Sequence, residues 1–168
     1  MDYLIDIETL KKSSYIDSNV NDEILTVTLK RVQDIYLEPV IGTVLYKRLL
    51  KGVDNEDLTS DEKALLVYIF DFLSVGCELK SSTHLNWKIR NKAVGSANDE
   101  HVNSNSISEY NNYRDELKKD LSFYKNRLIG YLKDNTSLYP KYTECNSNSE
   151  NLKPEEKGTN YSNKISFI

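Results

Sequence analysis

The chain has 168 residues, of which 29% are charged and 39% hydrophobic, and this size fits one globular domain rather than a multidomain enzyme. The cysteines Cys77 and Cys145 lie far apart without a CxxC spacing, so the pattern favours neither a disulfide framework nor a structural zinc site. The net charge of −4 disfavours a protein whose main task is to grip phosphate backbones. Acidic residues at the start of the sequence, where a signal peptide carries bases, lead us to expect no secretory leader and a protein that works in a cytosol or in an assembly formed there.

Charge and helix breakers are distributed in a way that bears on the fold class. Residues 1–80 hold 15 acids and 9 bases, whereas residues 107–142 hold 5 acids and 7 bases. Opposite charges of this kind can attract each other within one chain or between neighbouring copies. The sequence has only 6 Gly and 3 Pro, which predicts an all-α protein.

The first third of the sequence predicts three helical segments. Asp6 can cap a short turn over residues 7–12. Residues 20–37 form an amphipathic pattern with one apolar stripe at steps of three or four: Leu25, Leu29, Val32 and Tyr36. Pro39 disfavours helical geometry at the residue before it, so we expect this helix to end there. Another helix is expected over residues 43–51, ending at Gly52.

The middle of the chain predicts a buried helix. Thr59 and Glu62 have the spacing of a capping box, in which each side chain bonds the other's backbone amide. Residues 64–79 are apolar on nearly every side, and only Asp71 and Glu78 are plainly polar. This segment is too short, and its central carboxylate too costly, for a membrane span. We therefore expect the central helix of a bundle and no membrane association.

The last part of the chain predicts an arm, a long helix and a tail. Residues 88–105 read as an exposed arm or loose hairpin, and Ser106 and Glu109 form a second capping box. The helix that follows extends to about residue 135 and carries one apolar stripe: Tyr110, Tyr113, Leu117, Leu121, Tyr124, Leu128 and Tyr131/Leu132. Residues 143–168 have a composition typical of disorder unless they lie on another protein. The prediction is thus an all-α helical bundle of about four main helices over residues 1–142, with an extended C-terminal tail over residues 143–168.

The sequence contains no recognisable catalytic constellation. His84 and His101 have no partner at a triad or metal-ligand spacing, and no phosphate-binding glycine loop or nucleophile elbow is present. We expect no enzymatic activity, no metal and no cofactor. Asp71 is out of place in an apolar helix: it marks a site, or it bonds a tyrosine hydroxyl, a backbone amide or a base such as Arg127.

Two patterns bear on nucleic-acid binding. The bases Lys118, Lys119, Lys125, Arg127 and Lys133 form a possible nucleic-acid face, but acids share the same helix, which favours a mixed solvated surface. Residues 24–51 have the rough lengths of a helix-turn-helix but lack a basic recognition helix. Neither pattern predicts a DNA-binding domain.

Three stretches together resemble one protein family. They are residues 32–46 (VQDIYLEPVIGTVLY), residues 91–94 (NKAV), and residues 123–128 (FYKNRL) continuing through Tyr131-Leu132 to 138–142 (LYPKY). In their order and spacing they resemble head-tail connector (adaptor) proteins of tailed bacteriophages, as in crAss-like and other Bacteroidetes phages. The resemblance runs from about residue 3 to residue 142 and stops before the tail.

The resemblance implies a structural virion protein without an active site. Members of such a family form a ring, expected to be a dodecamer, in the neck between portal and tail, assembled in the host cytoplasm. The ring extends the DNA channel and offers the tail a docking surface. The implied partners are other copies of the chain, the portal protein, further neck and tail ring proteins, and genomic DNA that passes through without specific binding.

From this resemblance we predict two contact regions. The arm is expected to contact the portal or a neighbouring protomer through Lys88, Arg90, Asn91, Lys92 and Val94. The tail is expected to lie along a partner ring protein through Tyr161, Ile165, Phe167 and Ile168. The alternative from another class is a helical adaptor or regulator, of a phage or of its host, that binds a protein or a nucleic acid.

Overall fold

The computed structural model of the chain describes residues 3–90, 93–96, 107–143 and 154, and it describes side chains over 3–82 and 108–142. The fold class is all-α, as predicted, with four main helices. These are α2 (Asp22–Val32), α4 (Thr43–Asp54), α5 (Ser60–Asn86) and α6 (Ile107–Asp134). Shorter elements accompany them: α1 (Ile7–Lys12), a π-helical turn η1 (Gln33–Leu37), α3 (Glu38–Ile41) and α7 (Pro140–Thr143).

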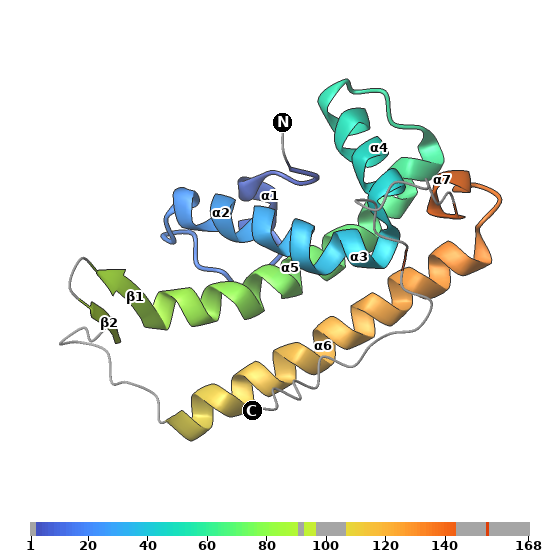
Figure 1. Ribbon diagram of the computed structural model, residues 1–168. Helices are drawn as coiled ribbons and strands as arrows, with labels where there is room; N and C mark the ends of the chain where they lie inside the picture. Colours follow the sequence, from blue (N-terminus) through green and yellow to red (C-terminus); the bar gives the residue numbers. More distant parts are fainter. Residues whose placement is uncertain (1–2, 91–92, 97–106, 144–153, 155–168) are drawn as a thin grey trace.

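The α5 helix is the centre of the bundle, as its apolar pattern predicted. It packs against α2 and η1 on one side and against α6 on another, with α4 and α7 near its start (Figure 1). Its fully buried apolar side chains are Leu65, Ile69, Phe72, Leu73 and Cys77. Val67 is an exception among the apolar residues of α5, because it is 60% exposed.

A capping box starts α5, as predicted. The Thr59 amide donates to Glu62 Oε2 at 2.9 Å, and the Glu62 amide donates to Thr59 Oγ1 at 3.1 Å. Glu62 also accepts two bonds from Arg48 of α4, each 2.9 Å long, and Arg48 reaches Asp57 in the connecting loop. The cap of α5 is therefore tied to α4 by a bidentate ion pair. The helix continues seven residues beyond the expected body, to Asn86.

The two N-terminal helices are capped by acceptor side chains. Asp6 accepts from the Thr9 amide at 2.7 Å and starts α1, as predicted. The start of α2 was predicted at residue 20, but the helix begins at Asp22 because Asn21 is the capping residue and accepts from the Glu23 amide. The predicted stripe is confirmed in burial: Leu25, Leu29 and Val32 are buried, and Tyr36 is half-buried.

The prediction that helical geometry ends before Pro39 was wrong. The chain stays helical to Ile41. The turn before the proline is the π-helical turn η1, in which the Glu38 amide donates to the Gln33 carbonyl, five residues back. A proline at the start of α3 fits this geometry, since it has no amide hydrogen to place. The break comes instead at Gly42, whose φ of 79° redirects the chain into α4.

The prediction that α4 stops at Gly52 was also wrong, since α4 continues to Asp54. Gly52 is buried, and a β-carbon built there would overlap the side chain of Leu58. The glycine at this position allows the α4–α5 loop to pack on the helix, and its role is close contact rather than helix termination.

Part of the predicted arm is a β-hairpin. β1 (Trp87–Arg90) follows α5 directly and pairs antiparallel with β2 (Ala93–Ser96), with Lys88 opposite Gly95 and Ile89 opposite Val94. The hairpin lies at the end of α5 away from α4 and α7 (Figure 1). Trp87, Ile89 and Val94 are aromatic or β-branched, residue types that are enriched in strands. The rest of the expected arm, residues 91–92 and 97–105, lies outside the described residues.

The long last helix, α6, has the predicted apolar stripe and packs against α5. Leu117, Leu121, Leu128 and Leu132 are buried along it. The aromatic members differ: Tyr110, Tyr124 and Tyr131 are half-buried, whereas Tyr113 is 44% exposed. Two stripe positions were missed, Lys125 and Ile129, which are both buried.

Two helical glycines give a test of the packing between α2 and α5. A β-carbon at Gly76 would lie 2.7 Å from Val32 Cγ1, whereas one at Gly130 has no neighbour within 4 Å. We expect Gly76→Ala to lower the free energy of unfolding by about 1–3 kcal/mol, because overpacking outweighs the better helix propensity of alanine. Gly130→Ala, the matched control, is expected to raise it by up to ~1 kcal/mol. Urea unfolding of both variants measures the two signs, and equal shifts would contradict the close α2–α5 contact.

Candidate functional site

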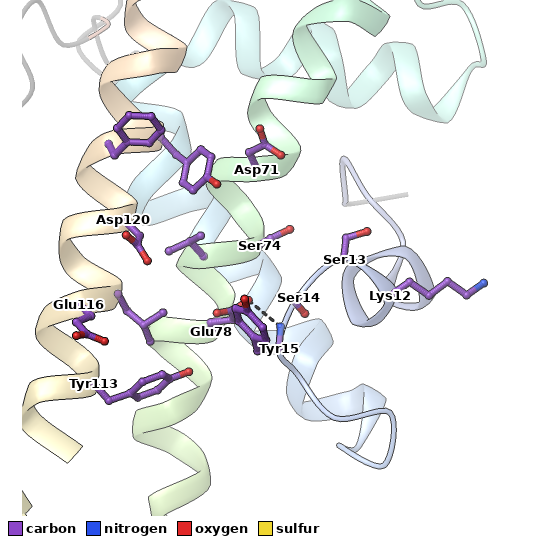
Figure 2. A pocket seen from close by; sticks show the side chains of 14 residues that line it. Lys12, Ser13, Ser14, Tyr15, Asp71, Ser74, Glu78, Tyr113, Glu116 and Asp120 are labelled. Atoms are coloured by element: carbon purple, nitrogen blue, oxygen red, sulfur yellow. Dashed lines mark hydrogen bonds between the residues drawn. The ribbon is translucent and has the colours of Figure 1, made fainter. Parts of the chain in front are cut away.

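An open cleft of about 810 Å³ lies between α5, α6 and the segment that follows α1 (Figure 2). α5 contributes Asp71, Ser74 and Glu78, and residues 12–15 form one wall. α6 contributes the side chains at Tyr113, Glu116, Leu117, Asp120, Phe123 and Tyr124. The cleft exists because α6 covers one side of α5 and the N-terminal segment another, leaving the seam between them open.

Carboxylates give the cleft its charge. Asp71, Glu78, Glu116 and Asp120 line it, and the one base in its lining is Lys12. Lys12 points away from α5 and α6 (Figure 2) and pairs with Glu8 at 2.7 Å. Lys118 of α6 pairs with Asp115, outside the lining, whereas Arg127 pairs with Asp71 and so offsets the charge of that carboxylate. The charges of Glu78, Glu116 and Asp120 therefore give the cleft a negative potential.

Glu78 is the most buried of these carboxylates, with 7% of the residue exposed. Its Oε1 accepts the Tyr15 amide at 3.0 Å, which ties the N-terminal segment to α5 (Figure 2). Burial raises the pKa of Glu78, the bond from Tyr15 partly offsets this, and the charge of Asp120 adds to the rise. Burial and the charge of Glu78 also raise the pKa of Tyr113.

Asp71 forms an ion pair, one of the arrangements expected for it. Arg127 Nη1 lies 3.0 Å from Asp71 Oδ2, with both side chains partly exposed. The same guanidinium lies 5.0 Å from the centroid of the Tyr68 ring, and Tyr68 stacks on Tyr131 at 4.1 Å. The contact joins α5 to α6, which is a structural role, and its partial exposure limits the stabilisation to about 1 kcal/mol or less.

Exposed aromatic rings border the acidic floor. Tyr15 is 95% exposed, Phe123 63% and Tyr113 44%. Exposed aromatic side chains beside a polar cleft are typical of surfaces that bind a protein, since they offer large contact area at low entropic cost. The arrangement can bind a basic and partly apolar partner.

The structure places some of the predicted contact residues and not others. Lys88 and Arg90 are in β1 and Val94 is in β2, by backbone only. Asn91, Lys92 and the tail residues Tyr161, Ile165, Phe167 and Ile168 lie outside the described residues.

The possible basic face of α6 is corrected by burial. Lys125 is fully buried, so it does not belong to a surface that could contact phosphates, and Arg127 is paired with Asp71.

His84 lies in α5, and His101 lies outside the described residues. Within the described ranges, no three His, Cys, Asp or Glu side chains gather in a way that could hold a metal ion. No helix among these residues is long and apolar enough to cross a membrane.

Sequence reasoning did not find the cleft, although part of the signal was present. Glu78 stood out as polar in an apolar helix, and Glu116 and Asp120, four residues apart, had to share a face of α6. That these faces meet depends on the rotation of α6 against α5, which the sequence pattern leaves open.

Comparison with known proteins gives a family. The fold and the surface define the class of protein: an all-α bundle with a β-hairpin arm and an acidic cleft. Residues 37–151, about two thirds of the chain, match a family of unknown function (DUF6712), and the chain belongs to that family. Neither the curated proteins nor the solved structures contain a significant match to the chain.

The buried position of Glu78 predicts how stability changes with pH. Because its folded pKa is raised, the folded state binds more protons than the unfolded state just above the ordinary pKa of 4.5, and stability falls as pH rises through that window. Glu78→Gln keeps the acceptor for Tyr15 and removes the charge. We expect it to raise Tm at pH 7 by roughly 2–4 °C, the effect of ~1 kcal/mol in a chain of this size.

The gain should shrink toward pH 4, where the native glutamate is itself protonated. Thermal unfolding followed by circular dichroism from pH 4 to pH 8 measures this difference. Glu116→Gln, on the exposed wall of the same cleft, is the control and should show no such pH-dependent gain. A variant less stable than the native chain at every pH would contradict the assignment of a buried carboxylate that resists ionisation.

Proposed function

We propose that the protein is a structural component of a tailed-phage virion that forms a dodecameric ring in the neck between portal and tail. In this role the ring extends the DNA channel and gives the tail a surface to dock on. Its partners are further copies of itself, the portal protein and other neck and tail ring proteins. The particle is assembled in the host cytoplasm.

The observation that carries the proposal is the β1–β2 hairpin, which extends from the end of α5, the central helix of the bundle. The core of the domain is built around α5, and the strand pair extends beyond it. The strand pair can therefore contact a neighbouring molecule. This supports the contact role expected for Lys88, Arg90 and Val94. The order of the stretches that resemble head-tail connectors is the second support, since two of them fall on η1–α4 and on α6–α7.

The proposal includes no chemical step. The thiol of Cys77 is buried, and burial raises its pKa to about 12, which suppresses the thiolate that a nucleophile requires. The carboxylates of the cleft include one held by Arg127 and one held by the Tyr15 amide, which are structural contacts. The net charge of −4 suits a channel protein that lets genomic DNA pass without gripping it.

A protein-binding adaptor is the second candidate, and one surface favours it. α2 and η1 expose Ile24, Val27 and Ile35 on the side away from the core. These positions follow steps of three and eight residues and so share one helical face. An exposed apolar face of this kind suits a protein partner better than a nucleic acid.

Electron microscopy of neck complexes purified from particles that contain the protein tests the ring directly. We expect a closed ring of about a dozen copies beneath a portal. A monomer bound to a host protein would favour the adaptor instead. A gel shift with duplex DNA at physiological salt should show no complex, because the cleft is acidic and Lys125 is buried.

Truncation tests the role of the tail. Tyr139 and Tyr142 are buried, so the helical core extends to them, and the Tyr139 hydroxyl bonds the Asp61 carbonyl at 2.7 Å. We expect removal of residues 144–168 to leave the thermal midpoint within a few degrees of the intact chain but to impair assembly of particles. Removal of residues 139–168 is the contrasting variant and should destabilise the bundle. A protein without residues 144–168 that builds normal particles would refute the contact role of the tail.

A further inference from the structure

The β1–β2 hairpin has two faces of different chemistry. Alternate residues of a strand fall on opposite faces, and the register places Ile89 opposite Val94. Positions 87, 89 and 94, which carry Trp, Ile and Val, therefore share one face, and positions 88 and 90, which carry Lys and Arg, share the other. A lone two-stranded hairpin is only marginally stable in water. A hairpin with this pattern gains stability when another surface packs against it.

The charge of the hairpin region is opposite to that of the cleft. Residues 81–98 contain three bases, at positions 88, 90 and 92, and no acid. The cleft offers the carboxylates of Glu78, Glu116 and Asp120, with the rings of Tyr113 and Phe123 at its edge. Carboxylates and exposed rings together are the chemistry that a basic and apolar strand pair would recognise.

We propose that the cleft of one copy binds the β1–β2 hairpin of the neighbouring copy. The proposal rests on the ring arrangement proposed above and names the contact that builds it. Because the hairpin and the cleft are different surfaces of the same chain, the contact is head-to-tail. Contacts of this type close into a ring when the rotation between neighbours permits it.

Geometry favours a second copy over the same copy. Asn86, where the hairpin begins, is eight residues beyond Glu78 on the continuous helix α5. At 1.5 Å per residue this is about 12 Å along a rigid rod. The hairpin of a chain therefore starts past the Glu78 side of its own cleft and lies beyond the end of α5, away from α4 and α7 (Figure 1).

Charge favours the hairpin over the C-terminal tail as the occupant. Residues 144–168 hold four acids and three bases, so their net charge does not complement an acidic cleft. The hairpin region is the most basic uninterrupted segment available to fill it. The electrostatic match also predicts that the contact weakens as salt is added.

Charge reversal on each side of the contact provides the test. The hairpin variant carries Lys88→Glu and Arg90→Glu, and the cleft variant carries Glu116→Lys and Asp120→Lys. Each full-length variant alone brings like charges together in every contact, and we expect self-association to weaken tenfold or more. An equimolar mixture has complementary charges in both of its alternating contacts and should recover association. Sedimentation velocity at low and high salt measures all of these states.

Two controls separate charge from folding. The pair Lys47→Glu and Lys63→Glu makes the same change in net charge as the hairpin variant, at exposed positions outside the cleft and the hairpin, and should leave association unchanged. Circular dichroism of each variant confirms that the bundle is folded. Recovery in the mixture cannot arise from misfolded chains, so it identifies the contact even if one variant is less stable alone.

Zero-length carbodiimide cross-linking of the native protein gives an independent readout. In a mixture of ¹⁴N- and ¹⁵N-labelled chains, we expect mixed-label peptides that join Lys88 to Glu116 or Asp120. Links from the cleft to residues 144–168 would overturn the hairpin as the occupant. Rings that persist in both reversal variants would overturn this contact and leave the proposed ring intact. A chain that stays monomeric at high concentration, without mixed-label links, would overturn the contact and the self-assembly on which it rests.

Discussion

Burial of the apolar surface of α5 holds the fold together and places the other elements. Phe72, Leu73 and Cys77 are fully buried, and each large apolar side chain removed from water contributes about 1.5–3 kcal/mol. One helix cannot bury such a surface alone, so α2 and η1 cover one side and α6 another. Gly76 shows how close the contact is, since it leaves room for Val32 and for little else.

The polar groups of α5 lie at the seam that this packing leaves open. Asp71 is satisfied by Arg127 across the α5–α6 contact, and Glu78 is satisfied by the amide of Tyr15. Both residues thus fasten a covering element to α5 while they border the cleft. Aromatic contacts also join α6 to α5. Tyr131 of α6 stacks on Tyr68 of α5, and the Tyr131 hydroxyl lies 3.0 Å from that of Tyr139.

In the folded protein, acidic residues gather in the cleft and basic residues lie in the hairpin region. Acids from α5 and α6 meet in the cleft, although α6 as a whole carries more bases than acids; of these bases Lys118 and Arg127 are paired and Lys125 is buried. The bases of the hairpin region follow directly on α5 and have no acid in the same segment. Because the bases follow the end of α5 and the acids line the cleft before it, the two surfaces are complementary in charge, which favours contacts between copies.

The sequence by itself determined the fold class, through its apolar periodicity, and most helix starts. Helix starts are predictable because a capping side chain bonds a backbone amide only two or three residues away. Asp6 with Thr9 and Thr59 with Glu62 bond as their spacing required. The local rules were wrong at two positions. Gly52 lies inside α4, with Leu58 packed against it, and the chain turns at Gly42 rather than before Pro39. The cleft was also beyond the sequence, since it arises where faces of α5 and α6 meet, and only packing sets how the two helices are rotated against each other.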